Sequence, residues 1–179
     1  KQFGEFRETG KPNSAVRIYS SQDTDELVFL DIEASRKNGS NHDSLIAIVR
    51  SAAEECFMPL AAGGGINSID QVRELILSGA DKVVINTAAV LNPSLITEVA
   101  KQFGSQCVVA GIDYRNNEGR NLVWIKSGSE ETDLDPVSHA INLVNLGAGE
   151  IFINSIDRDG MMEGYDLETS NAVAKAVPV

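Results

Sequence analysis

Short apolar runs alternate with longer segments of helical period along most of the chain. Strands are expected at residues 27–32, 59–62, 83–86, 106–113 and 150–154. Helices are expected at residues 12–21, 43–56, 69–78, 93–103, 136–146 and 167–176. Ser68 and Asp135 are suited to cap two of these helices, and Gly79 and Gly147 to end them. The pattern is five β/α units in series, preceded by a polar segment at residues 1–10 and one extra helix.

The strand at residues 27–32 is unbroken by polar side chains before Asp31, which is typical of a strand covered on both faces. An insertion follows residue 113, with a turn at 116–119 and a short exposed strand at 122–126. Repetition of one unit with short links favours a closed parallel barrel over an open doubly wound sheet. We therefore expect a single α/β domain over residues 1–179, with the architecture of a (β/α)8 TIM barrel.

The formal net charge of −11 argues against nucleic acid as a partner, because phosphate backbones require faces rich in Lys and Arg. No stretch is long and apolar enough to cross a bilayer, so no membrane partner is expected. Cys56 and Cys107 lack the spacing of metal ligands and are expected to be reduced, buried thiols. We expect a cytoplasmic protein without a metal or cofactor.

Three aspartates follow strand-like runs. Asp31, Asp113 and Asp157 each stand at the end of one, and strand ends share one face of a parallel barrel. A carboxylate there can move protons, although each aspartate could instead bind loop amides as a structural residue. Asp157 opens the segment Asp-Arg-Asp-Gly, with Asp159 and Gly160, whose alternative is an internal salt bridge that shapes the loop.

A phosphate site is expected at the same face. Gly63, Gly64 and Gly65 lie between a strand and a helix, where glycine lets the backbone approach an anion. Asn86 and Thr87, at the end of the next strand, add an amide and a hydroxyl beside them. The alternative is a tight turn without a ligand.

Charged residues also mark the opposite ends of the strands. Glu26, Lys82 and Glu150 each stand at or near the start of a strand, so they should converge on the bottom of the barrel. They could form an ion network for stability, or gate a passage through the barrel. His42 and His139 lie away from strand ends and are expected at the surface.

These strings closely resemble the cyclase subunit of imidazole glycerol phosphate synthase. The matching runs are DELVFLDI (25–32), GGGI (63–66), GADKV (79–83), INTAAV (85–90), FGSQ (103–106), GAGEI (147–151) and SIDRDG (155–160). They span nearly the whole chain, in order and at the family's spacing. The resemblance implies a (β/α)8 barrel that receives ammonia from a glutaminase subunit docked at its bottom, in a heterodimer.

The resemblance also implies a reaction. Ammonia and the bis-phosphorylated aminoimidazole-carboxamide ribonucleotide PRFAR would give imidazole glycerol phosphate and the aminoimidazole carboxamide ribotide AICAR, a lyase step of histidine biosynthesis. Asp113 would be a general acid/base, Asp31 a supporting carboxylate, and Glu26, Lys82 and Glu150 the ammonia gate. The phosphate and substrate site would comprise Asp31, Gly64, Gly65, Asn86, Thr87, Asp157, Asp159 and Gly160.

Some features depart from the family pattern. The chain begins at Lys1 without Met and stops at Val179, so we expect a fragment covering about strands 2 to 6. The other catalytic aspartate and the second phosphate loop of the family are expected outside it. Met161 and Met162 stand where the family usually has Thr-Lys. The alternatives are therefore a paralogue that passes ammonia to a sugar amidotransferase of surface-polysaccharide synthesis, and a scaffold without catalysis.

Overall fold

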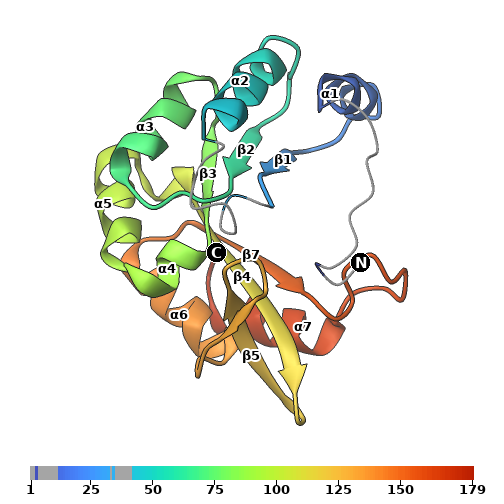
Figure 1. Ribbon diagram of the computed structural model, residues 1–179, viewed down its shortest axis with the longest axis vertical. Helices are drawn as coiled ribbons and strands as arrows, with labels where there is room; N and C mark the ends of the chain where they lie inside the picture. Colours follow the sequence, from blue (N-terminus) through green and yellow to red (C-terminus); the bar gives the residue numbers. More distant parts are fainter. Residues whose placement is uncertain (1–2, 4–11, 33, 35–41) are drawn as a thin grey trace.

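Five parallel strands form the centre of the molecule in this computed structural model, which describes Phe3, residues 12–32, Ala34 and residues 42–179 (Figure 1). They are β1 Leu27–Leu30, β2 Leu60–Gly63, β3 Lys82–Ile85, β4 Val108–Asn117 and β7 Glu150–Ser155, in the spatial order β1-β2-β3-β4-β7. Because all five run in one direction, their carboxyl ends meet on one edge. The alternation of strands and helices confirms the expected α/β class and forms part of a (β/α)8 barrel. Apart from Phe3, the N-terminal segment at residues 1–10 lies outside the described residues.

The helices follow the strands as the apolar periodicity predicts. They are α1 Pro12–Ser20, α2 His42–Ala53, α3 Ile69–Leu77, α4 Thr87–Leu91, α5 Ser94–Phe103, α6 Pro136–Leu146 and α7 Leu167–Ala176. Ser68 caps α3 by accepting the amide of Gln71, and Asp135 caps α6. Gly147 ends α6 at a φ of 115°, a left-handed conformation that favours glycine. A short 3₁₀ turn at Ser105–Cys107 leads into β4.

The core lies between the sheet and the helices. Figure 1 shows α2, α3, α5 and α6 along one side of the arc of strands. Alternate side chains of the strands, such as Leu60, Val83 and Val108, belong to the large apolar cluster on this side. On the opposite side a separate small cluster of Ala61, Val84 and Val109 lines the concave face.

The expectation that residues 27–32 are covered on both faces is wrong. Strand β1 ends at Leu30, and its burial alternates: Leu27 is 9% exposed, whereas Val28 is 37% and Leu30 is 39% exposed. The reason is its position, because β1 is at the edge of the described sheet and only its helix-facing side chains are covered.

The insertion after Asp113 is a hairpin that extends the sheet. Strand β5 Arg120–Ile125 pairs antiparallel with the outer half of β4, and β6 Glu130–Glu131 pairs with β5. The turn between β4 and β5 is where the sequence predicts it. The expected exposure of this strand is wrong, because Leu122, Val123 and Ile125 are buried.

Two further expectations about burial are corrected. His139 is buried, at 4% exposure, because it shares the inward stripe of α6 with Pro136, Ala140 and Leu143. Cys56 and Cys107 are free thiols but only half-buried, and each donates to a nearby backbone carbonyl oxygen. No helix in the part of the chain described here has the length and apolar character needed to span a membrane.

Candidate active site

Asp113 lies on the concave face near the carboxyl ends of the strands. Its register partner in β7 is Asn154, and Asn86 follows the end of β3 on the other side. The amide Nδ2 of Asn86 donates to Asp113 Oδ2 at 2.8 Å, and Nδ2 of Asn154 donates to Asp113 Oδ1 at 3.2 Å. Side chains from β7 and from the residue after β3, on either side of β4, thus hold this carboxylate.

The environment of Asp113 disfavours its charge. Burial raises the pKa of its carboxyl to about 6, against the opposing effect of the hydrogen bonds from Asn154 and Asn86. The negative charge of Asp159 raises this pKa further. A carboxyl group with a pKa in this range can take up and release protons near neutral pH, which suits general acid/base chemistry.

Gly111 provides the space for the Asn86 side chain. It lies two residues before Asp113 on the same strand, and therefore on the same face. A Cβ atom at Gly111 would stand 3.2 Å from Cβ and 3.4 Å from Nδ2 of Asn86. The missing side chain thus lets Asn86 lie against β4, within reach of Asp113.

The glycine turn after β2 brings two backbone segments close together. Gly64 and Gly65 have positive φ angles of 118° and 68°. A Cβ atom at Gly64 would stand only 2.4 Å from the backbone oxygen of Asp31, so the turn packs directly against the chain after β1. The amide of Asp31 also donates to the Gly63 carbonyl oxygen at 2.8 Å. Asp31 and the turn therefore form one structural unit.

Asn86 and Thr87 stand at the end of the neighbouring strand, but their side-chain contacts lead elsewhere. Asn86 binds Asp113, as described above. Thr87 Oγ1 accepts the backbone amide of Lys126 at 3.0 Å, which ties the start of α4 to the end of β5. A hydroxyl that accepts this bond still has its own proton to donate to an anion.

The loop after β7 is held to β4 by ionic contacts. Asp157 Oδ1 lies 3.2 Å from Arg115 Nε, and its Oδ2 accepts the amide of Asn116 at 2.8 Å. The Arg115 guanidinium also lies 4.7 Å from the centre of the Trp124 ring. Arg158 donates to the carbonyl oxygen of Tyr165 instead. The loop is therefore shaped by contacts of Asp157 across to β4.

Asp159 and Gly160 complete this loop. The negative charge of Asp159 raises the pKa of Asp113, so the loop lies at the same end of the sheet as this part-buried carboxyl group. Gly160 has a positive φ of 67°, so the chain reverses there in a conformation that favours glycine. The loop thus adds a carboxylate to the mouth.

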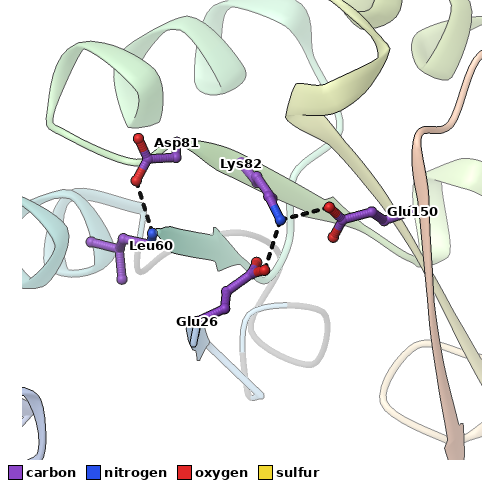
Figure 2. Close-up of polar contacts among 5 residues, drawn as sticks. All are labelled: Glu26, Leu60, Asp81, Lys82 and Glu150. Carbon is purple, nitrogen blue, oxygen red and sulfur yellow. Dashed lines mark hydrogen bonds and ion pairs between the residues drawn. The ribbon is translucent and has the colours of Figure 1, made fainter. Parts of the chain in front are cut away.

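A second polar cluster lies at the opposite ends of the strands (Figure 2). Lys82 Nζ lies 2.7 Å from Glu26 Oε2 and 2.6 Å from Glu150 Oε1. Burial lowers the pKa of Lys82, but its bonds to Glu150 and Glu26 outweigh this effect and the pKa is raised. Asp81 is directed away from the group and accepts the Leu60 amide at 2.8 Å. The structure therefore brings the three predicted residues together, with the two carboxylates of Glu26 and Glu150 on the ammonium group of Lys82.

The sequence analysis overlooked Asn154. The residue precedes Asp157, the first residue of the Asp-Arg-Asp-Gly segment, by three positions and carries no motif of its own. Strand alternation offers the only signal, since it places Asn154 on the same face as Phe152 and Glu150. Its contact with Asp113 depends on the β4–β7 register, which the sequence does not show.

Comparison with known proteins agrees with this geometry. Residues 1–179 match the family model described as histidine biosynthesis protein. The chain is 47% identical over 178 residues to imidazole glycerol phosphate synthase subunit HisF of Myxococcus xanthus, covering 99% of this chain and 69% of that protein. It is 45% identical over 178 residues to the subunit of the same name from Alkaliphilus metalliredigens, with the same coverage. The chain belongs to the histidine biosynthesis protein family, together with these HisF subunits.

Proposed function

We propose that this chain is part of the cyclase subunit of an imidazole glycerol phosphate synthase. In this reaction PRFAR and ammonia give imidazole glycerol phosphate and AICAR. The observation that carries the proposal is Asp113, a part-buried carboxyl group that Asn86 and Asn154 hold near the carboxyl ends of the strands, with a pKa of about 6. The similarity of the chain to the HisF subunits supports this choice of reaction class.

Asp113 is assigned the proton transfers. Above its pKa the carboxylate can accept a proton from the reacting group, and the resulting acid can return that proton to a leaving atom. The hydrogen bonds from Asn86 and Asn154 occupy one lone pair on each oxygen. A carboxylate has about four acceptor sites, so lone pairs remain for the substrate.

The phosphate site is assigned to the two loops after β2 and β3. Gly64 and Gly65 bring backbone close to the ligand without a side chain in the way, and Thr87 can donate its hydroxyl proton. Asn86 borders this site through its contact with Asp113. A dianion bound by amides and one hydroxyl requires no cluster of lysines, which agrees with the net charge of −11.

The remaining acidic residues at the mouth are assigned to substrate binding. Asp31 and the loop with Asp157, Asp159 and Gly160 lie at the same strand ends as Asp113. Carboxylates there can accept hydrogen bonds from ribose hydroxyls and amide groups of the ribonucleotide. Asp157, held by Arg115, also keeps the loop in place.

Glu26, Lys82 and Glu150 are assigned to the entry of ammonia from a glutaminase partner. They lie at or just before the amino ends of their strands, whereas Asp113 lies near the carboxyl ends. A group of opposite charges at this position presents a polar opening whose ion pairs must separate before a small molecule can pass. The partner is a glutamine amidotransferase subunit that docks at this end.

A second candidate function is passing ammonia to a sugar amidotransferase, with little cyclisation. The loop after β7 favours this second function, because Met161 and Met162 occupy positions where the family usually has Thr-Lys. The Met162 side chain is fully exposed, at 100%. This substitution removes a hydroxyl and a cation from the loop.

One assay separates these functions. The full-length protein is incubated with PRFAR and an ammonium salt, so that no glutaminase is needed, and release of AICAR and imidazole glycerol phosphate is followed. The cyclase proposal expects both products in equal amounts. No turnover, combined with tight binding of a glutaminase, would support the ammonia-passing function instead.

A further inference from the structure

The carboxyl group of Asp113 is held by two neutral amides and by no cation among the described residues. At the carboxyl ends of the neighbouring strands, the charged residues are Asp31, Arg115, Lys126, Asp157, Arg158 and Asp159, while Lys82 and Glu150 lie at the amino ends of β3 and β7. The cations have other contacts: Arg115 lies 3.2 Å from Asp157, Lys126 lies 2.6 Å from Glu130, and Lys82 lies 2.6 Å from Glu150. Arg158 donates to the carbonyl oxygen of Tyr165. The two amides therefore carry the direct side-chain contacts to Asp113.

Both amides come from rigid positions. Asn154 is within β7 and is the register partner of Asp113, so the two side chains start from adjacent points on one face. Asn86 directly follows β3 and lies in the space that Gly111 leaves open. Donors on ordered strands hold a carboxyl group more accurately than donors on loops.

Two amides act on a carboxylate differently from a cation. An N–H donor stabilises the charged form, but it adds no opposite charge that would drive the group to remain ionised at low pH. One donor on each oxygen also fixes the plane of the carboxyl group and directs its free lone pairs. This arrangement keeps the group oriented while leaving its proton affinity high.

We propose that Asn86 and Asn154 are positioning residues that orient the Asp113 carboxylate and favour its proton-accepting form. Asn154 is the new assignment, and for Asn86 this role is distinct from phosphate binding. The proposal rests on the proposed function, because the orientation of Asp113 matters for catalysis only if Asp113 transfers protons. The positioning contacts themselves can be tested without turnover.

The test replaces Asn154 by leucine, which has a similar shape and no donor. The pKa of the Asp113 carboxyl is measured by NMR titration of the full-length protein, with the signal assigned by its loss in Asp113→Asn. Loss of a hydrogen bond to the charged form should raise this pKa by about one unit. The same shift should appear in the pH profile of ammonium-driven turnover.

A matched control and a second variant keep the test decisive. Phe152→Leu changes packing on the same face of β7 without removing a donor, and should leave the Asp113 pKa unchanged. Asn86→Leu removes the other donor and should raise the pKa by a similar amount, even if Asn154→Leu does not fold. An unchanged pKa in the folded variants would overturn the positioning role, whatever the turnover. If the variants raise the Asp113 pKa but the wild-type protein itself shows no cyclase activity, the positioning role is supported and the proposed function is rejected.

Discussion

Asp113 and Asp157 are two aspartates near the same strand ends, and their surroundings give them different chemistry. Asp157 pairs with Arg115 and accepts the backbone amide of Asn116, so its contacts tie the loop to β4. Asp113 lies part-buried between two neutral amides, and its pKa is raised to about 6. A carboxylate tied to a cation and a backbone amide serves loop structure, whereas a carboxyl group that titrates near neutrality serves proton transfer.

His139 is a buried polar residue without a matching role in the site. Its Nε2 atom has no hydrogen-bond partner among the residues that the structure describes, although His139 is only 4% exposed. Burial lowers the pKa of His139, and the charge of Asp135 only partly opposes this. The folded protein therefore binds a proton at His139 less readily than the unfolded chain does.

Replacing His139 by leucine should make the fold less sensitive to acid. In the wild type, the unfolded state takes up a proton as pH falls through about 6.5 and the folded state resists it, so stability falls with pH in this range. The variant has no titrating group at this position, so on acidification its free energy of unfolding should fall by about 1 to 2 kcal/mol less than that of the wild type. Loss of the unpaired buried nitrogen should add a stabilisation that does not depend on pH. Urea unfolding between pH 8 and pH 5 measures the difference.

His42→Gln serves as the control for that measurement, because the imidazole of His42, only 15% exposed rather than at the surface as expected, has a partner in Glu74 at 3.0 Å. The control should retain the acid-dependent loss of stability seen in the wild type. Parallel pH dependence of the wild type and the His139→Leu variant would contradict the account of His139.

At the scale of elements, the hairpin ties the ends of several strands together. The turn after β5 has three consecutive positive φ angles, at Lys126, Ser127 and Gly128. Its Lys126 amide binds Thr87 after β3, and Ser127 Oγ donates to the Ile32 carbonyl oxygen at 2.9 Å. The insertion thus links the chain after β1 to the chain after β3.

Gly64→Ala should destabilise the turn after β2 by about 2 to 4 kcal/mol, because the new Cβ would strike backbone of Asp31 and the φ of 118° is strained for alanine. Neither chain can move alone without separating β1 from the turn. Gly119→Ala isolates the φ contribution, since Gly119 also has a positive φ but nothing within 4 Å of its Cβ position. Equal losses in the two variants, measured by urea unfolding, would show that the close contact contributes nothing.

Elements with strong local signals could be predicted from the sequence. The caps at Ser68 and Asp135 and the apolar period of α7 gave helices close to their observed bounds. Helix α4 was missed because five residues, Thr87–Leu91, are too few to show a helical period. The exposure of Val28 and the burial of Ile125 depend on neighbouring elements that local pattern does not contain.

At the scale of the whole molecule, the parallel strands separate two polar clusters. Asp113 lies near their carboxyl ends, and Lys82 lies at their amino ends with Glu26 and Glu150. The sequence placed both groups, because strand ends can be identified from apolar runs. It could not place Asn154, whose contact with Asp113 depends on register between distant strands.

Lys82→Met should impair glutamine-driven turnover while leaving ammonium-driven turnover nearly unchanged. The substitution leaves two carboxylates facing each other without a cation, and so alters the opening at the glutaminase end. We expect a loss of at least about tenfold with glutamine, which corresponds to about 1.4 kcal/mol in the barrier. Lys101→Met, at an exposed position on α5, is the control. Equal activity of Lys82→Met and wild type with glutamine would contradict the gate assignment.

The central claim is that Asp113 carries the proton transfers, and ammonium-driven turnover of Asp113→Asn in the full-length protein tests it most directly. The asparagine has nearly the same shape and cannot act as a carboxylate, so PRFAR should still bind. Turnover should fall by about 10² to 10⁴, the usual contribution of general acid/base catalysis. Wild-type turnover in this variant, at saturating PRFAR and ammonium, would contradict the claim.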